Sequence, residues 1–200
     1  MSLLGRLFGR RQPSVQDFAA PMIDMANESE RVHRVFLDTY IRDITIGILP
    51  VPESPVPTRP SSRGVFKARL FNALHVVAAC LIRTGDSDKV YKLMNLATGV
   101  AIEPLSGGGE LELDRDEARK IFDSFEPLVL RALAGALRQA PVSHESRSME
   151  LELLAERLHE CHAESIGDDL YNREVRDRFD MTVQTSVASS VNHAAKIAGL

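Results

Sequence analysis

The sequence has few cysteines that could cross-link its fold. Of its 200 residues only two, Cys80 and Cys161, are cysteines, and there is no tryptophan. Two thiols cannot form a disulfide framework in a chain of this length, and such frameworks belong to oxidising compartments. We therefore expect a fold held by its own apolar core, in a reducing compartment, with a cytoplasmic location.

The sequence also lacks an excess of positive charge and a long uninterrupted apolar run. Its formal net charge is -4 and its pI is about 5.9, which argues against a nucleic-acid partner, because such proteins gather basic side chains to neutralise phosphates. The longest apolar run, residues 70–82, is interrupted by Asn72 and His75 and falls short of the about 20 residues that span a bilayer. This run predicts a buried core helix.

Apolar–polar alternation of the kind that marks strands is missing, whereas apolar residues recur every three or four positions throughout. We predict an all-α fold, a single bundle of about six helices. We divide the chain into an N-terminal arm (1–13), a first long helix (14–49), a proline-rich connector (50–64) and the main bundle (65–200), which packs with residues 14–49 as one domain. Five prolines between positions 50 and 60 exclude a helix from the connector.

Local signals place the ends of the later helices. The segment from Thr84 to Ser87 ends a central helix and caps the next, and Asp114 with Glu117 has the spacing of a capping box. We expect Pro127 to kink or restart its helix. Residues 168 and 169, both aspartates, are expected to cap a long C-terminal helix rich in small side chains. These small residues favour close packing within the chain, with a second copy of the protein as the alternative partner.

Motifs that would carry common enzyme chemistry are missing. The sequence has no G-x-S-x-G, no phosphate-binding G-x-x-x-x-G-K-[ST] and no G-x-G-x-x-G, so we expect no cofactor. The glycines at 107–109 are interpreted as part of a linker between helices.

One segment, residues 155–164, is dense in side chains that bind metals, and its weak candidate ligands are His159, Cys161 and His162. On a helix, however, Glu156 points about 160° away from the inward-facing Leu158. Zinc sites need three or four converging ligands, and we find no second cluster of matching spacing. We therefore predict no metal site here and a solvated, charged helix face.

Three polar residues on otherwise apolar helix faces could line a pocket, namely His33, Asn72 and His75. The alternative is that they satisfy one another and their neighbours by hydrogen bonds inside the core.

The N-terminal arm is the most distinctive stretch of the sequence. Wound as a helix, it places its apolar side chains on one side, with arginines on the other side and at its end. The residues expected to contact a membrane or partner are Leu3, Leu4, Arg6, Leu7, Phe8, Arg10 and Arg11. This pattern is typical of helices that lie in an anionic membrane interface. Because the arm is short and contains two glycines, we expect it to be mobile until it meets lipid or a partner. Docking on the bundle as an ordinary first helix is the alternative.

These observations favour a non-enzymatic helical binding, adaptor or regulatory protein, whose partner is another protein or an anionic membrane surface reached through the arm. The alternative is an enzyme or a metal- or cofactor-binding bundle with a site built from core histidines.

Overall fold

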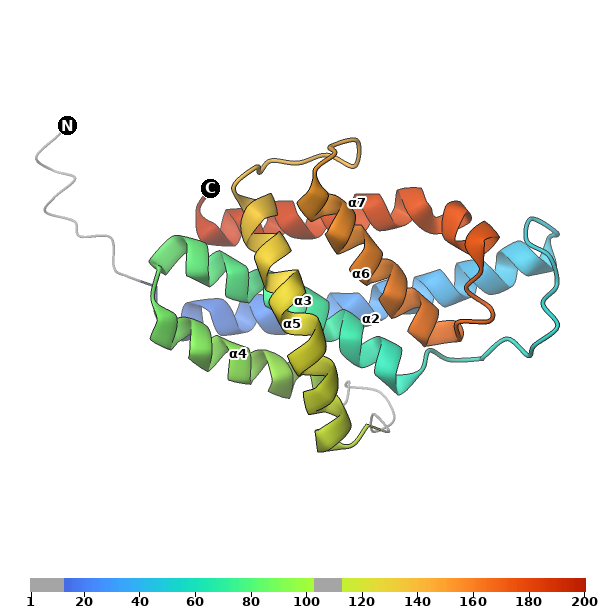
Figure 1. Ribbon diagram of the computed structural model, residues 1–200, viewed down its shortest axis with the longest axis horizontal. Helices are drawn as coiled ribbons and strands as arrows, with labels where there is room; N and C mark the ends of the chain where they lie inside the picture. The colour runs from blue at the N-terminus through green and yellow to red at the C-terminus, as the bar shows by residue number, and fades with distance from the viewer. Residues whose placement is uncertain (1–12, 103–112) are drawn as a thin grey trace, which may run out of the picture.

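The structure, a computed structural model, describes residues 13–102 and 113–200. Within these ranges it contains helices and no strand, so the predicted all-α bundle is confirmed (Figure 1). The six helices are α2 (Gln16–Thr45), α3 (Ser62–Thr84), α4 (Ser87–Ile102), α5 (Arg115–Leu137), α6 (Met149–Ile166) and α7 (Arg173–Ala198). The proposed contact residues of the N-terminal arm and the glycines at 107–109 lie outside the described residues.

Helix α3 is the centre of the bundle, as its apolar sequence predicts. It contacts all five other helices, and side chains on every side of it are buried, including Phe66, Leu70 and Leu74. Among the described helices it alone is long and apolar enough to cross a membrane by length and composition, and 78% of that apolar window is buried inside the protein. Its apolar surface is thus covered by its neighbours (Figure 1).

The first turn of α3 is fixed tightly against the end of α6. Ser61 caps α3 by accepting a hydrogen bond from the backbone of Gly64, and its own N–H donates to the Ser165 carbonyl at 3.0 Å. A Cβ atom added to Gly64 would lie 2.7 Å from the backbone of Ser165. Only glycine permits this approach of the two helices.

Two predicted helix boundaries are confirmed. The Asp114 carboxylate accepts from the backbone N–H of Glu117 at 2.7 Å, which makes it the N-cap of α5. Gly85 ends α3 with a positive φ of 61°, and the Asp86 side chain accepts from the first backbone N–H groups of α4.

Two predicted boundaries are wrong, and at a third one of two alternatives is excluded. Helix α5 does not restart at Pro127, because it runs from Arg115 to Leu137 with Pro127 inside it. The N-cap of α7 is Asn172, which accepts from the N–H of Val175 at 3.1 Å, and not either aspartate at 168 and 169. Helix α2 ends at Thr45, four residues before the expected end, because the chain turns back so that the N–H groups of residues 48 and 49 donate to the Asp43 carbonyl.

Residues 46–61 form neither helix nor strand, and α3 begins at Ser62, inside the stretch assigned to the connector. Leu49 is a buried member of a second apolar cluster, separate from the main core, and Val56 packs against this cluster. The other buried members of this cluster are Phe36, Leu37, Tyr40, Ile166, Leu170, Val175 and Phe179. The proline-rich segment is thus anchored to the bundle at two points.

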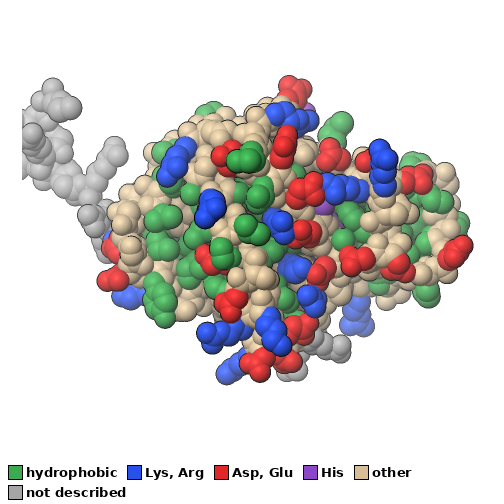
Figure 2. Space-filling view, in the orientation of Figure 1, with side chains coloured by type: hydrophobic (Ala, Val, Ile, Leu, Met, Phe, Trp, Pro, Cys, Tyr) green, Lys and Arg blue, Asp and Glu red, His purple; other side chains and the backbone are tan. Residues whose placement is uncertain are grey.

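The face of the molecule shown in Figure 2 carries acidic and basic side chains interspersed over its surface. No broad patch of one sign is visible on this face. This mixture accords with the near balance of the composition, with 24 basic and 28 acidic residues.

Candidate functional site

An elongated groove opens between α2 and α7. The two helices run antiparallel (Figure 1), and their backbones do not pack closely against each other. Three adjoining hollows, of about 310, 270 and 290 Å³, follow one another along the space between them. We call this the α2–α7 groove, lined by residues 24–39 of α2 and 179–193 of α7.

The helical repeat explains why these two faces leave a groove. On α2, positions three or four apart, such as Met25, Ser29 and Val32, lie on one side and face α7. The facing side of α7 carries short side chains, among them Ser186 and Ser190. Short side chains cannot fill the space between two helices whose backbones stay apart, so the groove remains open.

One end of the groove is apolar. The rings of Phe36 and Phe179 meet edge to face at 4.7 Å, and Val35 beside them is 52% exposed. Beyond this end the buried carboxylate of Asp43 accepts from Nε of Arg178 at 2.9 Å, which ties α2 to α7. An exposed valine beside two aromatic rings offers an apolar surface to a bound molecule.

The middle of the groove is polar and is organised by Asn72 of α3. Its amide nitrogen donates to Oγ of Ser29 at 2.6 Å, and its amide oxygen accepts from Oγ of Ser190 at 3.4 Å. Asn72 therefore links α2, α3 and α7 across the floor of the groove. Partly buried hydroxyl and amide groups of this kind can exchange hydrogen bonds with a bound molecule.

Two buried histidines complete the floor. The rings of His33 and His162 stack with centroids 4.6 Å apart, and His162 stacks in turn on Phe36 at 4.2 Å. Nε2 of His33 lies 3.2 Å from the carbonyl oxygen of Cys161. Because a carbonyl only accepts, Nε2 carries the proton and Nδ1 is an acceptor. Neither Nδ1 of His33 nor Nδ1 of His162 has a hydrogen-bond partner among the described residues.

Burial sets the charge of this histidine pair. It lowers the pKa of His33 to about 4, although the carbonyls of Cys161 and Ser29 oppose it, and it lowers the pKa of His162 well below the ordinary value. The nearby ring of His33 lowers the pKa of His162 further. Both imidazoles are neutral at pH 7, so the rings beneath the groove carry no charge, and their Nδ1 atoms are enclosed within the protein.

The structure brings together two of the three predicted pocket residues. His33 and Asn72 line the same hollow. His75 is fully buried in the main core, where its Nδ1 lies 2.9 Å from the Phe71 carbonyl, and it lines none of the groove's three hollows.

The prediction that residues 155–164 form a solvated helix face is wrong for the histidines, because His159 and His162 are both only 3% exposed. They also diverge, because His162 lines the α2–α7 groove whereas His159 bonds to the connector between α6 and α7. The Cys161 thiol is buried, which raises its pKa. Glu156 faces solvent as predicted and pairs with Arg176. In the described part of the chain, no group of His, Cys, Asp and Glu side chains could hold a metal ion.

Sequence reasoning missed the contribution of α7 to the groove. The small residues of its C-terminal half predicted close helix packing, and its buried alanines and valines do pack on the core. The serines and threonines of the other face, such as Thr182 and Ser186, line the groove. The available signal in the sequence was that the hydroxyl side chains and the alanines of α7 fall on different faces of the helix.

No family model, curated protein or solved structure matches the chain. The groove is therefore interpreted from its own shape and chemistry.

Proposed function

We propose that the protein is a helical binding protein that receives an amphipathic helix of a protein partner in the α2–α7 groove. The observation that carries this proposal is an open groove with an apolar end and a polar middle. Grooves between helices commonly receive the apolar face of a partner helix.

The dimensions favour a helix over a compact small molecule. Along α2 the groove extends over residues 24–39, about 22 Å at 1.5 Å per residue, which is the length of about four helical turns. The space is divided among three connected hollows, none larger than about 310 Å³. Such a series suits successive side chains from one face of a helix.

The chemistry along the groove predicts the order of side chains in its occupant. Aliphatic or aromatic residues would lie against Val35 and Phe36, and hydroxyl or amide side chains would lie over Asn72. Asp24 lines the opposite end and would favour a basic residue there, whereas Glu28 beside it is paired with Arg31. The occupant is thus expected to be apolar on one face and basic at one end.

A fluorescein-labelled peptide with the sequence of residues 1–12 is a suitable probe, because it is amphipathic and basic. Fluorescence anisotropy should detect its binding to the full chain. Val35→Glu places a charge on the exposed wall of the groove and should weaken binding at least about tenfold, equivalent to about 1.4 kcal/mol.

Leu128→Glu is the matched control, since Leu128 is similarly exposed, at 43%, but lies on α5 and lines none of the groove's hollows. It should leave peptide binding unchanged. No binding of the peptide, or equal binding by both variants, would contradict the proposal.

A further inference from the structure

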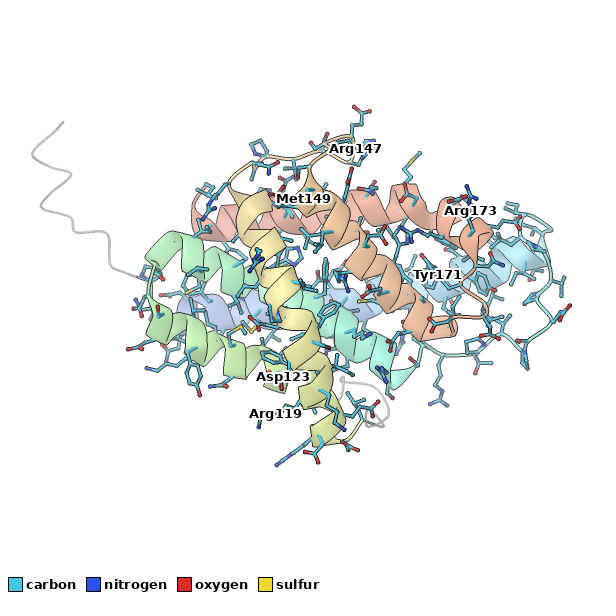
Figure 3. All side chains as sticks on the ribbon, in the orientation of Figure 1. Arg119, Asp123, Arg147, Met149, Tyr171 and Arg173 are labelled. Carbon is cyan, nitrogen blue, oxygen red and sulfur yellow. The ribbon has the colours of Figure 1, made fainter. Side chains whose placement is uncertain are left out.

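Outside the groove, a further hollow of about 510 Å³ lies where α6 leads through a short connector into α7. His159 of α6, Tyr171 of the connector and Arg176 of α7 are among the residues that line it. Figure 3 shows Tyr171 and Arg173 at this end of the molecule. The groove and this hollow share no lining residue, so the two sites can be tested separately.

His159 and Tyr171, which line this hollow, form a hydrogen-bonded series with Asp180, which lies outside its lining. Nε2 of His159 lies 3.3 Å from a carboxylate oxygen of Asp180, and Nδ1 lies 2.5 Å from the hydroxyl oxygen of Tyr171. An ionised carboxylate only accepts, so Nε2 of His159 carries the proton. Its Nδ1 therefore has a free electron pair and accepts the O–H of Tyr171.

This order of groups is the arrangement that activates nucleophiles in enzymes. In this arrangement a hydroxyl lies within hydrogen-bond reach of a base, and a third group orients that base. Tyrosine is one of the residues that form covalent intermediates in enzymes. His159 is suited to act as the base because burial lowers its pKa, which keeps the ring neutral at pH 7. Asp180 opposes this effect and fixes the tautomer.

We propose that Tyr171 is a nucleophile that takes an acyl group from an uncharged ester bound in this hollow, with His159 as its base and Asp180 as a positioning residue. The charges around the hollow compensate one another, which suits an uncharged substrate. Of the carboxylates that line it, Glu156 pairs with Arg176, Glu160 with Arg157 and Asp177 with Arg173.

The reaction needs the histidine because the phenol does not ionise by itself. Burial raises the pKa of Tyr171 well above its usual range, so the hydroxyl stays protonated at neutral pH. As the oxygen of Tyr171 attacks the ester carbonyl carbon, its proton passes to Nδ1 of His159. The bond from the carbonyl carbon to the leaving oxygen then breaks, and that oxygen takes the proton from the imidazolium.

The products of this step are an acyl-tyrosine ester, a free alcohol and a neutral His159. In a second step, water can attack the acyl-tyrosine while His159 accepts its proton. The acid is then released and the phenol is restored. The balance of both steps is one ester and one water converted to one acid and one alcohol.

The test uses p-nitrophenyl acetate with the full chain, and acid quenches the reaction before the first turnover is complete, so that the acyl-tyrosine is counted before water removes it. Peptide mass spectrometry then measures acetylation at each of the three tyrosines. Tyr91 is an internal comparator because it is 68% exposed, and Tyr40 is a buried one at 2%. Exposure alone predicts fastest labelling at Tyr91. Our proposal predicts fastest labelling at Tyr171, and Tyr171→Phe should remove that signal only.

Two variants of α7 carboxylates test the role of Asp180. The Asp180 carboxylate is 52% exposed, and Glu174 is exposed and does not line the hollow, so neither change should disturb folding. Asp180→Asn should slow acetylation of Tyr171 at least about tenfold relative to Tyr91, whereas Glu174→Gln should not change this ratio.

The pH profile provides a second readout that a purely structural role would not alter. Acetylation of Tyr171 should level off once His159 is neutral, because the imidazole then takes the phenol proton. Labelling of Tyr171 that is no faster than that of Tyr91, or that does not respond to Asp180→Asn, would overturn the proposal.

Discussion

Buried neutral histidines should make the protein lose stability between pH 7.5 and pH 5.0. Burial lowers the pKa values of His33 and His75 to about 4, from 6.5 in an unfolded chain. The unfolded state therefore binds more protons than the folded state in this range. The stabilising contribution of each neutral ring is complete above pH 6.5 and is lost progressively as the pH falls toward 4.

The size of this loss follows from the two pKa values. At pH 5.0 an unfolded histidine is almost fully protonated, whereas His33 or His75 with a pKa of about 4 is about nine-tenths neutral. The difference corresponds to about 2 kcal/mol for each residue. The pair should together lower the free energy of unfolding by about 4 kcal/mol, a large part of the about 5–15 kcal/mol of a typical domain. His162 acts in the same direction.

Urea unfolding followed by circular dichroism at the two pH values measures this effect. Replacing His75, whose Nε2 has no hydrogen-bond partner among the described residues, by leucine should reduce the loss between pH 7.5 and 5.0 by about 2 kcal/mol. His144→Gln is the control, because His144 is half exposed and should leave the pH dependence unchanged. Equal unfolding free energies at both pH values would refute the reasoning.

Two further predictions concern the helix contacts and the arm. In the same urea assay, Gly64→Ala should destabilise the protein by about 1–3 kcal/mol, because the new Cβ meets the backbone of Ser165. Gly99→Ala should instead stabilise α4 by about 0.5–1 kcal/mol, because no described atom lies within 4 Å of its new Cβ. The opposite order would show that α3 and α6 can separate freely. The full chain should sediment with vesicles of anionic phospholipid at low salt, and deletion of residues 1–12 should abolish this without changing thermal unfolding. A lower unfolding temperature after the deletion, with no vesicle binding by the full chain, would assign the arm to the core instead.

Helix content and the central position of α3 could be predicted because they depend on features within each segment. The apolar residues of α3 cover most of its circumference, and the caps at Asp114 and Gly85 are local backbone chemistry. The cap of α7 was misplaced for a related reason. The aspartates at 168 and 169 have a suitable side chain, but Gly167 and the residues after it form turns, and the helix begins only where Asn172 can bond to Val175. Residue type alone does not distinguish among three neighbouring candidates.

The candidate site was harder to predict because it depends on contacts between distant segments. A single inward face explains the burial of Leu151, Leu154 and Leu158, but α6 packs against α3, α5 and α7 and also contacts α2. Its buried arc is therefore wider than one stripe. Phe36 of α2 covers His162, and the hydrogen-bonded Tyr171 covers His159. Neither contact can be predicted from the sequence of α6 itself.

The wide buried arc of α6 also connects the two proposed sites. His159 and His162 are three residues apart, so they lie about one turn from each other on neighbouring sides of the helix. One ring is part of the groove floor and the other is held by Asp180 and Tyr171. The nearby ring of His159 lowers the pKa of His162, which is an electrostatic effect of one site on the other. Protonation of either imidazole therefore opposes protonation of the other, and burial, which lowers both pKa values, keeps both rings neutral at pH 7.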